Sequence, residues 1–539
     1  MTSKFVKLTS VAVAAVLALS TLSACGSSSK ESVSKLPEPT YKVSQDTPAW
    51  KSDKSKNNTL TWYVNADWWN SSFGKDLVTR QLQKDLNLKI KFITGDDAKL
   101  NTFFASGDMP DIITTFDVNS KIARTASQWA LPLEQLGDKY DPYFKKTVRK
   151  ETMDWYRMKD GNVYGYPSYA NTKEDYESGM IPPRQAFVIR QDVLNAIGSQ
   201  DFTTPDGFRQ GMQAIKDKFP DLVPFGFENY NNGSNGGLDV VMQDLLGVPI
   251  LTSDKKFNNR NTDSEYVKWL ETLRQVHQDG NISDDSFSDD SDTYKEKVAS
   301  GKYATMILAS SVGQSTPLQA FKANNPGAEY VAVDAIRSTD GRKPTLSQGG
   351  MSGWSISYIS KKTKNPAKAI QLFEYLLSDY GQMLTNFGIE GDTYVKNDDG
   401  TISWSDKAQK LRLEDPDKFV KDYRCGEFVL FGHDRYKALN KDTFVEALWQ
   451  MQHWGQEYLT PQFEIENTDP DTGTREARSL SAVKTNWGTT LVSLIRANSQ
   501  KEFDNLLTEY QNFEKSNGID AINKLRNEKI AENMKKLGE

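Results

Sequence analysis

The sequence predicts an α/β fold, because strand and helix patterns alternate along the chain. Apolar residues alternate with more polar ones over 60–64 and again over 88–92, which predicts two strands that each bury one face. The stretch between them, residues 73–86, has the apolar spacing of a helix. A strand–helix–strand unit of this kind is typical of parallel sheets.

Further elements follow in the same alternation. Short apolar runs predict strands over 112–115 and 223–227. Two helices are expected to begin directly after Thr204 and Asn365, because both residues can cap a helix and each is followed by Pro, which fits the first helical turn. Towards the C-terminus, apolar spacing predicts helices over 489–497 and 519–534.

The composition is that of a globular protein with room for more than one domain. Of the 539 residues, 37% are hydrophobic and 26% are charged. A formal net charge of −6, without any basic stretch, argues against nucleic acid as the main partner. The 12 Trp and 22 Tyr residues are a large supply of flat rings with polar edges, which suits a binding surface as well as a core.

The N-terminus is typical of a bacterial lipoprotein signal. Lys4 and Lys7 precede the apolar run Val11–Leu19, which is too short to span a bilayer. Small residues then lead to Cys25. We therefore expect residues 1–24 to be a signal peptide. Cys25 would be acylated and would become the mature N-terminus, held by lipid at the extracellular face of the cytoplasmic membrane.

The segment after the cysteine differs in composition from the rest of the chain. Residues 25–57 are rich in Ser, Lys and Pro and have no apolar periodicity. This composition predicts a flexible tether between the lipid anchor and the folded domains. No later apolar stretch approaches 18 residues, so a second membrane anchor is not expected.

Neither a metal centre nor a catalytic motif stands out. The two cysteines and three histidines are too few for a disulfide framework or a Cys- or His-rich metal site, and there is no nucleophile elbow, P-loop, GxGxxG or HExxH motif. Two Asp-rich stretches, 284–292 and 469–473, lack calcium-loop spacing and are interpreted as solvated loops. We expect no cofactor, metal or catalytic residue. The two catalytic carboxylates of a glycosidase have no fixed separation along the sequence, so a glycosidase stays open as an alternative.

A series of short motifs runs through the chain in order. After the lipoprotein box at Cys25 come the stretches Leu60–Val64, Ala105–Ile113, Gly161–Pro167, Val188–Val193, Gly350–Trp354, Asn365–Ile370 and Tyr380–Gly391. Each motif is weak by itself, but their order and spacing are specific together. In this series the chain resembles the extracellular solute-binding proteins of carbohydrate ABC transporters, chiefly their large lipoprotein subgroup and more distantly the maltose-binding proteins.

The resemblance implies a periplasmic-binding-protein-like fold. In this fold two α/β lobes are joined by a hinge of several chain crossings, and the ligand lies in the cleft between them. By analogy, residues 58–180 and 350–430 form lobe one, and residues 181–349 and 431–539 form lobe two. Relatives often have a calcium loop after the helix that here follows Thr204. Residues 218–224 lack its alternating Asp/Asn ligands, so structural calcium is not expected.

Candidate binding residues follow from the needs of a sugar ligand. Aromatic rings cover the C–H faces of a sugar and planar polar groups reach its hydroxyls. Ligands of α/β sheets lie beyond the carboxyl ends of the strands. The loops after strands 60–64 and 112–115 meet both conditions with Asn65, Asp67, Trp68, Trp69, Phe116 and Asp117. Two adjacent Trp residues in a polar loop favour cleft lining over core packing.

Further binding residues are expected near the crossings between the lobes and in lobe two. Tyr169 and Tyr166 lie at the first crossing, and Trp354 borders the second in a Gly-rich turn. Resemblance to maltose-binding protein implies contacts from Glu228, Tyr230 and Trp487, the last directly before the expected helix 489–497. Core or hinge packing is an equal alternative for all of these except Tyr169.

The resemblance implies a monomeric receptor that captures an oligosaccharide and delivers it to the permease subunits of an ABC importer, without catalysis. Two alternatives stay open. One is the same fold with a peptide or another solute as ligand, and the other is a secreted carbohydrate-active enzyme. An enzyme would release a product, whereas a receptor returns its sugar unchanged.

Overall fold

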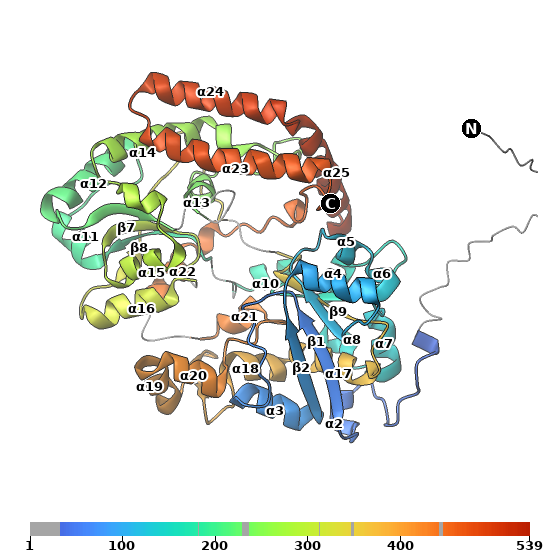
Figure 1. Cartoon of the computed structure of the whole chain (residues 1–539). Helices are drawn as coiled ribbons and strands as arrows, with labels where there is room; N and C mark the ends of the chain where they lie inside the picture. The colour runs from blue at the N-terminus through green and yellow to red at the C-terminus, as the bar shows by residue number, and fades with distance from the viewer. Residues whose placement is uncertain are drawn as a thin grey trace, which may run out of the picture.

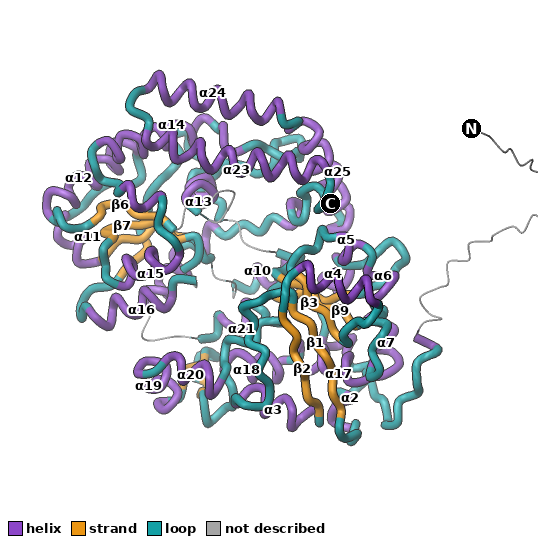
Figure 2. Tube along the Cα trace, in the orientation of Figure 1, coloured by secondary structure: helices purple, strands orange, loops and turns teal. Residues whose placement is uncertain are grey.

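Two mixed β-sheets, each covered by helices, make up the described part of the chain (Figures 1 and 2). The structure is a computed structural model and describes residues 33–179, 181, 183–228, 237–311, 313–346, 350–440 and 446–539. Of the candidate lipidation and binding residues, Cys25 and Tyr230 lie outside these ranges, as do the expected signal-peptide residues 1–24. Across these ranges, no helix has the combined length and apolar composition that a bilayer span requires.

The first lobe is built on a five-stranded sheet with the order β2-β1-β3-β9-β4. β1 pairs in parallel with β2 and β3, whereas β9 runs antiparallel between β3 and β4. The strands are β1 Asn58–Val64, β2 Leu88–Thr94, β3 Ile112–Thr115, β4 Gly165–Ser168 and β9 Ser355–Ile359, with a separate hairpin of β10 Tyr394–Lys396 and β11 Ile402–Trp404.

Helices from two parts of the sequence cover this sheet. The N-terminal group is α2 Ala49–Ser52, α3 Leu77–Leu86, α4 Asp97–Ser106, α5 Lys121–Arg124, α6 Ala126–Trp129, α7 Leu133–Tyr140, α8 Phe144–Thr147, α9 Lys150–Trp155 and α10 Lys173–Glu177. The later group is α17 Pro366–Leu377, α18 Asp379–Phe387, α19 Asp406–Glu414, α20 Pro416–Tyr423 and α21 Asp434–Lys437. α17 is buried on nearly every side and joins the core that contains Trp62 and Phe431.

The second lobe has a four-stranded sheet with the order β6-β7-β5-β8. β6 and β7 are parallel, and β5 is antiparallel to both β7 and β8. The strands are β5 Ala186–Arg190, β6 Val223–Phe227, β7 Tyr303–Leu308 and β8 Tyr330–Ala332.

The C-terminal part of the chain supplies three long helices to the second lobe. In Figure 1, α23 and α24 run side by side across the top of this lobe, next to α14. The helices of this lobe are α11 Gln191–Ile197, α12 Pro205–Lys218, α13 Leu238–Leu245, α14 Ser264–Gln278, α15 Ser291–Ala299, α16 Ser315–Asn324, α22 Glu446–Trp454, α23 Arg475–Arg496, α24 Gln500–Ser516 and α25 Ile519–Leu537.

The structure confirms the predicted α/β class and most elements read from local patterns. The strands over 112–115 and 223–227 have the predicted bounds, and the unit β1–α3–β2 is parallel as expected. Thr204 and Asn365 do cap α12 and α17, because each side chain accepts a backbone amide of the first turn. The expected helix over 489–497 is wrong in extent, since it is the end of the 22-residue α23.

The chain leaves the first lobe for the last time after residue 440. α21 packs on α18, and Asn440 forms a β-bridge with Ile402 of β11. Residues 434–440 therefore accompany the first lobe, later than the expected boundary at 430.

The segment before β1 is packed on the first lobe, which corrects the expectation of a flexible tether for residues 33–57. Val33 is buried, and the hydroxyl of Tyr140 donates to the Pro37 carbonyl at 2.6 Å. Further along, the Trp50 indole donates to Glu374 at 3.0 Å and Asp53 forms a buried ion pair with Lys368 at 2.8 Å. These contacts have no regular spacing, so apolar periodicity could not reveal them.

Two buried carboxyl groups lie where this segment meets α7 and α17. The backbone amide of Ala49 donates to Asp141 at 3.1 Å, and Glu374 accepts from Trp50 and Thr147. Burial raises the pKa of both carboxyls to about 7, and their mutual repulsion contributes to the rise for Asp141. Since the folded protein holds these protons more tightly than the unfolded chain, its stability falls as pH rises from about 4 to 7.

We expect Asp141→Asn to stabilise the protein at pH 8 and to flatten this pH dependence. The amide resembles the protonated acid, so it removes a buried charge that costs on the order of 1–3 kcal/mol above pH 7 and nothing below pH 4. Urea unfolding at pH 5 and pH 8 measures the effect, with the exposed Asp46→Asn as control. A variant that is less stable than the parent chain at pH 8 would contradict the assignment.

Candidate functional site

Four aromatic side chains meet at one edge of the first sheet. Trp68 and Trp354 are 62% and 45% exposed, and their rings stack with centroids 5.7 Å apart and planes at 28°. Phe116 packs edge-on against Trp354 at 4.9 Å and lies 6.1 Å from Trp68, and Tyr169 lies 6.5 Å from Trp354. We call these four residues the aromatic platform. Phe116 and Tyr169 are half-buried, and two large exposed indoles stacked beside them mark a binding surface rather than a core.

The topology of the sheet explains why residues so distant in sequence meet. Trp68, Phe116 and Tyr169 follow the carboxyl ends of β1, β3 and β4, and Trp354 directly precedes the antiparallel β9. All four therefore lie at the same edge. Gly353 is needed in this arrangement, because its φ is +65° and a Cβ there would lie 2.3 Å from the Ser168 carbonyl oxygen.

A buried arginine supports the loop that bears Trp68. The Arg424 guanidinium donates to the carbonyl oxygens of Asn70 and Ser72 at 2.5 and 2.7 Å. It also lies over the ring of Trp69, 5.2 Å from its centroid. Arg424 is fully buried, and desolvation lowers its pKa. Sequence reasoning missed this residue, because nothing near it in the chain indicates a role in a loop after β1.

Polar groups surround the platform. The amide of Asn65 donates to Asp97 at 2.7 Å and accepts from the Tyr63 hydroxyl at 3.0 Å, so it is held in one orientation. Asp67 is exposed in the same loop as Trp68. Asp117, directly after Phe116, is exposed and accepts from Thr472 of the opposite lobe at 2.7 Å. These groups could bond the hydroxyls of a ligand that lies on the rings.

Two expected binding residues pack inside the first lobe instead. Trp69 is only 4% exposed and lies among Phe92, Phe428 and Arg424, and Tyr166 is buried near Phe431. Their rings do not reach the surface of the platform, which corrects the cleft-lining position expected for Trp69 and Tyr166, whereas Trp68 is exposed. Within the turn after β1, adjacent side chains point in opposite directions, so only one of the pair faces outwards.

The expected residues of the second lobe lie apart from the platform. Glu228 follows β6 and accepts from the Ala309 amide at 3.1 Å and from Gln314 at 2.8 Å, and burial raises the pKa of its carboxyl. Trp487 lies inside α23 rather than before a helix, and its indole donates to the buried Asp239 at 3.2 Å. It lines a cavity within the second lobe.

The two lobes contact each other through the loop before α23 and through α25. Arg124 of α5 forms an ion pair with Asp471, which also pairs with Lys529 at 2.9 Å. Lys536 donates to the carbonyl of Trp155 at 3.0 Å. At the hinge, Glu466 accepts the amides of Met351 and Ser352 at 3.0 and 2.6 Å, and burial raises its pKa to about 7. Figure 1 places α25 beside the first lobe near α5.

The described residues contain no group of three or more His, Cys, Asp or Glu side chains suited to a metal ion. Two α/β lobes, several crossings between them and an aromatic platform with two exposed indoles at the sheet edge define a two-lobed binding protein. Residues 64–383 match the profile of the bacterial extracellular solute-binding proteins. Because this match covers more than half of the chain, the protein belongs to that family, as the motifs predicted.

Two characterised proteins are similar to this chain in sequence. Lipoprotein LipO of Bacillus subtilis (strain 168) is 26% identical over 336 residues, which cover 58% of this chain and 62% of LipO. The fructooligosaccharide ABC transporter substrate-binding protein FusA of Streptococcus pneumoniae serotype 4 is 26% identical over 422 residues, which cover 73% of each chain. The alignment thus spans less than two thirds of LipO.

Solved structures share the fold. The alginate-binding protein AlgQ2, solved without calcium ion, has a TM-score of 0.62 at 18% identity and covers 89% of this chain and 99% of its own. FusA of S. pneumoniae in complex with kestose has a TM-score of 0.62 at 16% identity, with 88% and 99% covered. These likenesses confirm the periplasmic-binding-protein-like fold. The binding role of each platform residue stays a prediction.

Proposed function

We propose that this protein is a lipid-anchored extracellular receptor that captures an oligosaccharide and delivers it to the permease of an ABC importer. The observation that carries the proposal is the aromatic platform at the edge of the first sheet. A pair of stacked indoles with Phe116 and Tyr169 beside them offers flat apolar area to the C–H faces of sugar rings. Asn65, Asp67 and Asp117 are the expected partners of the hydroxyls.

The named ligands of relatives support a saccharide over a peptide. FusA, by its name, takes up fructooligosaccharides, and its structures contain kestose and fructo-nystose. A solute-binding protein from Bifidobacterium longum infantis is named as HMO-binding and ABC-transporter-associated, and NgtS of Streptococcus pneumoniae is named for N-glycan transport. A peptide ligand would need unpaired backbone partners along a groove, whereas the platform offers ring faces.

Capture is proposed to work by lobe closure. A ligand on the platform would contact the first lobe, and groups of the second lobe would complete the site when the lobes approach. Two contacts join the lobes at residues that are close to Phe116 in sequence: Asp117 bonds Thr472, and Arg124 pairs with Asp471. A ligand that strengthens these contacts would favour the closed form, which is the form expected to meet the permease.

A titration with defined oligosaccharides tests the proposal. Trp fluorescence and calorimetry with kestose, nystose, alginate oligosaccharides, milk-type oligosaccharides and an N-glycan core would identify the ligand class. The mature protein is expected to bind at least one of these and to return it unchanged by mass spectrometry. A released product would favour the enzyme alternative. Binding of peptides with no binding of any saccharide would overturn the proposal.

The lipid anchor is tested separately by Cys25→Ser. Two acyl chains hold a protein stably on a membrane where one chain is marginal, so loss of the acylated residue should release the protein or leave an unprocessed precursor. Fractionation of cells and mass spectrometry of the N-terminus measure both outcomes. Ser23→Ala, which keeps the cysteine, is the control. Unchanged processing and membrane retention of Cys25→Ser would contradict the assignment.

A further inference from the structure

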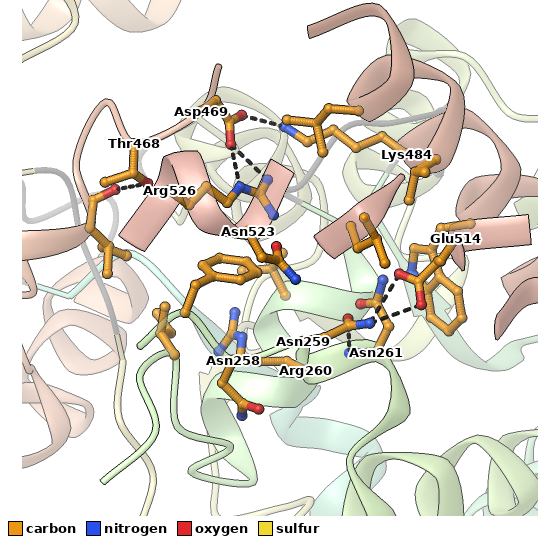
Figure 3. Close-up of a pocket in the computed structure, with 18 of the residues that line it drawn as sticks. Asn258, Asn259, Arg260, Asn261, Thr468, Asp469, Lys484, Glu514, Asn523 and Arg526 are labelled. Carbon is orange, nitrogen blue, oxygen red and sulfur yellow. Dashed lines mark hydrogen bonds and ion pairs between the residues drawn. The ribbon is translucent and has the colours of Figure 1, made fainter. Parts of the chain in front are cut away.

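A partly open cavity lies within the second lobe, between α13, the loop before α14 and the three C-terminal helices (Figure 3). Its volume is about 490 Å³, within the range of small-molecule sites. Side chains from segments far apart in sequence form its walls, among them Asp239, Phe257, Asn258, Asn259, Arg260, Asn261, Asp469, Lys484, Trp487, Tyr510, Glu514, Asn523 and Arg526.

The charges around the cavity balance. Three carboxylates and three cationic side chains line it, and most are paired with each other or with a neighbour. Asp469 takes ion pairs from Arg526 at 2.7 Å and Lys484 at 2.8 Å, as Figure 3 shows. Arg260 pairs with the buried Asp244 behind the wall. A ligand with a net charge would meet no excess of opposite charge here, so the walls select a neutral molecule.

The polar groups of the wall are held in place by one another. Asn259 donates to Glu514 at 3.0 Å, Glu514 accepts from the Tyr510 hydroxyl at 2.6 Å, and Asn261 donates to that hydroxyl at 3.1 Å. Burial raises the pKa of the Glu514 carboxyl. Asn523 differs, because its buried Oδ1 has no hydrogen-bond partner among the described residues. A buried amide oxygen without a partner carries a free-energy cost, which a ligand hydroxyl would relieve once the Asn523 side chain turned this solvent-inaccessible oxygen towards the cavity.

The cavity also combines aromatic faces with these amides. Phe257 carries the Arg526 guanidinium on its ring at 4.2 Å, and Trp487 packs against Tyr510 at 4.7 Å. One residue of the first lobe, Asn119, reaches the lining. Asn119 follows Phe116 by three residues in a turn closed by the Ser120 amide and the Asp117 carbonyl. Asn119 therefore connects the cavity wall to the loop that bears Phe116 of the platform.

We infer that this cavity binds a single neutral saccharide unit, with Asn523 as a direct hydrogen-bond partner. Rings for the C–H faces, fixed amides for the hydroxyls and balanced charge are the chemistry that such a unit requires. The unit is either the terminal residue of an oligosaccharide that lies on the platform or a free monosaccharide. The first source rests on the proposed function, whereas the second does not.

The test compares Asn523→Leu with Lys524→Leu. Leucine removes the amide oxygen and narrows the cavity, while the same change at the exposed neighbour Lys524 leaves the lining intact. Glucose, fructose, mannose, galactose and N-acetylglucosamine are titrated singly, and then kestose and nystose, with Trp487 among the fluorescent reporters. We expect Asn523→Leu to weaken binding about tenfold or more, and Lys524→Leu to leave it unchanged. Crystals of the unaltered mature protein with each bound sugar keep the test valid if a variant fails to fold.

The outcomes distinguish a terminal oligosaccharide unit from a free monosaccharide as the ligand of the cavity, and some outcomes overturn the inference. If Asn523→Leu and Trp68→Ala both weaken oligosaccharide binding, the cavity holds a terminal unit. If Asn523→Leu removes monosaccharide binding and leaves oligosaccharide binding intact, the ligand is a free sugar. Oligosaccharide bound on the platform with the cavity empty would overturn this inference and leave the proposed function standing. A monosaccharide in the cavity with no oligosaccharide bound anywhere would support this inference and overturn the proposed function. The absence of any sugar from the cavity overturns the inference in every case.

Discussion

Replacing Trp68 by alanine is expected to lower the affinity for the bound oligosaccharide at least about tenfold while the melting temperature of the free protein stays nearly constant. The indole is 62% exposed and stacks on Trp354, so its removal takes ring area from a ligand and little packing from the core. A ring contact contributes roughly 0.5–1.5 kcal/mol beyond its buried area, and about 1.4 kcal/mol corresponds to tenfold in affinity. We expect Trp354→Ala to lower the affinity as well.

Tyr380→Ala is the matched control. Tyr380 is another large exposed ring of the first lobe, but it packs on Trp50 and Tyr375 and donates to Asp85, away from the platform. Its loss should leave the affinity unchanged. Calorimetry of ligand binding and thermal unfolding without ligand measure the two quantities separately. A Trp68→Ala protein with lower melting temperature and full affinity would show that the ring is structural and would contradict the site.

Arg424→Met is expected to destabilise the protein by about 2–5 kcal/mol and to weaken ligand binding as well. The change keeps most of the side-chain volume but removes the donors to the carbonyls of Asn70 and Ser72. A hydrogen bond that involves a charged group contributes about 1.5–3 kcal/mol, and the change removes two of them. The freed loop bears Trp68, so its indole would be held less firmly and would lose part of its stacking on a ligand.

Arg424→Lys and Arg80→Met complete this experiment. Lysine keeps the charge but not the planar fork, so it should retain one of the two carbonyl contacts and fall between the parent chain and Arg424→Met. Arg80 is exposed on α3, and the same change there should alter neither quantity. Urea unfolding and ligand titration are the measurements. If Arg424→Met lowered stability and left affinity intact, Arg424 would be a core residue without a positioning role.

Elements with a local signature could be predicted from the sequence. β3 and β6 are short apolar runs with turn residues around them, and α12 and α17 each begin with a capping residue followed by Pro. Such signals act between residues a few positions apart, so they do not depend on the rest of the chain. The long helix α23 was expected only in its last third, because polar residues dominate its first turns.

Contacts between distant segments could not be predicted in the same way. The segment 33–57 has the composition of a linker, yet Asp53 and Lys368 form an ion pair in the interior. The cavity of the second lobe is lined by α13, α23, α24 and α25 together. Of its walls, only Trp487 was expected to bind ligand, and Asp469 was expected in a solvated loop rather than in ion pairs with Lys484 and Arg526. A signal for the others would need covariation between positions far apart in the chain.

The sequence by itself determined the α/β class, the strand edges where side chains can meet a ligand, and the family to which the chain belongs. The tertiary structure alone decided which aromatic side chains are exposed to solvent. Trp68 and Trp69 are neighbours in one polar loop, yet Trp68 faces outwards beside Trp354 whereas Trp69 lies under Arg424. The reason is physical: periodicity, caps and turns depend on neighbours along the chain, whereas exposure depends on what the rest of the chain places against a side chain.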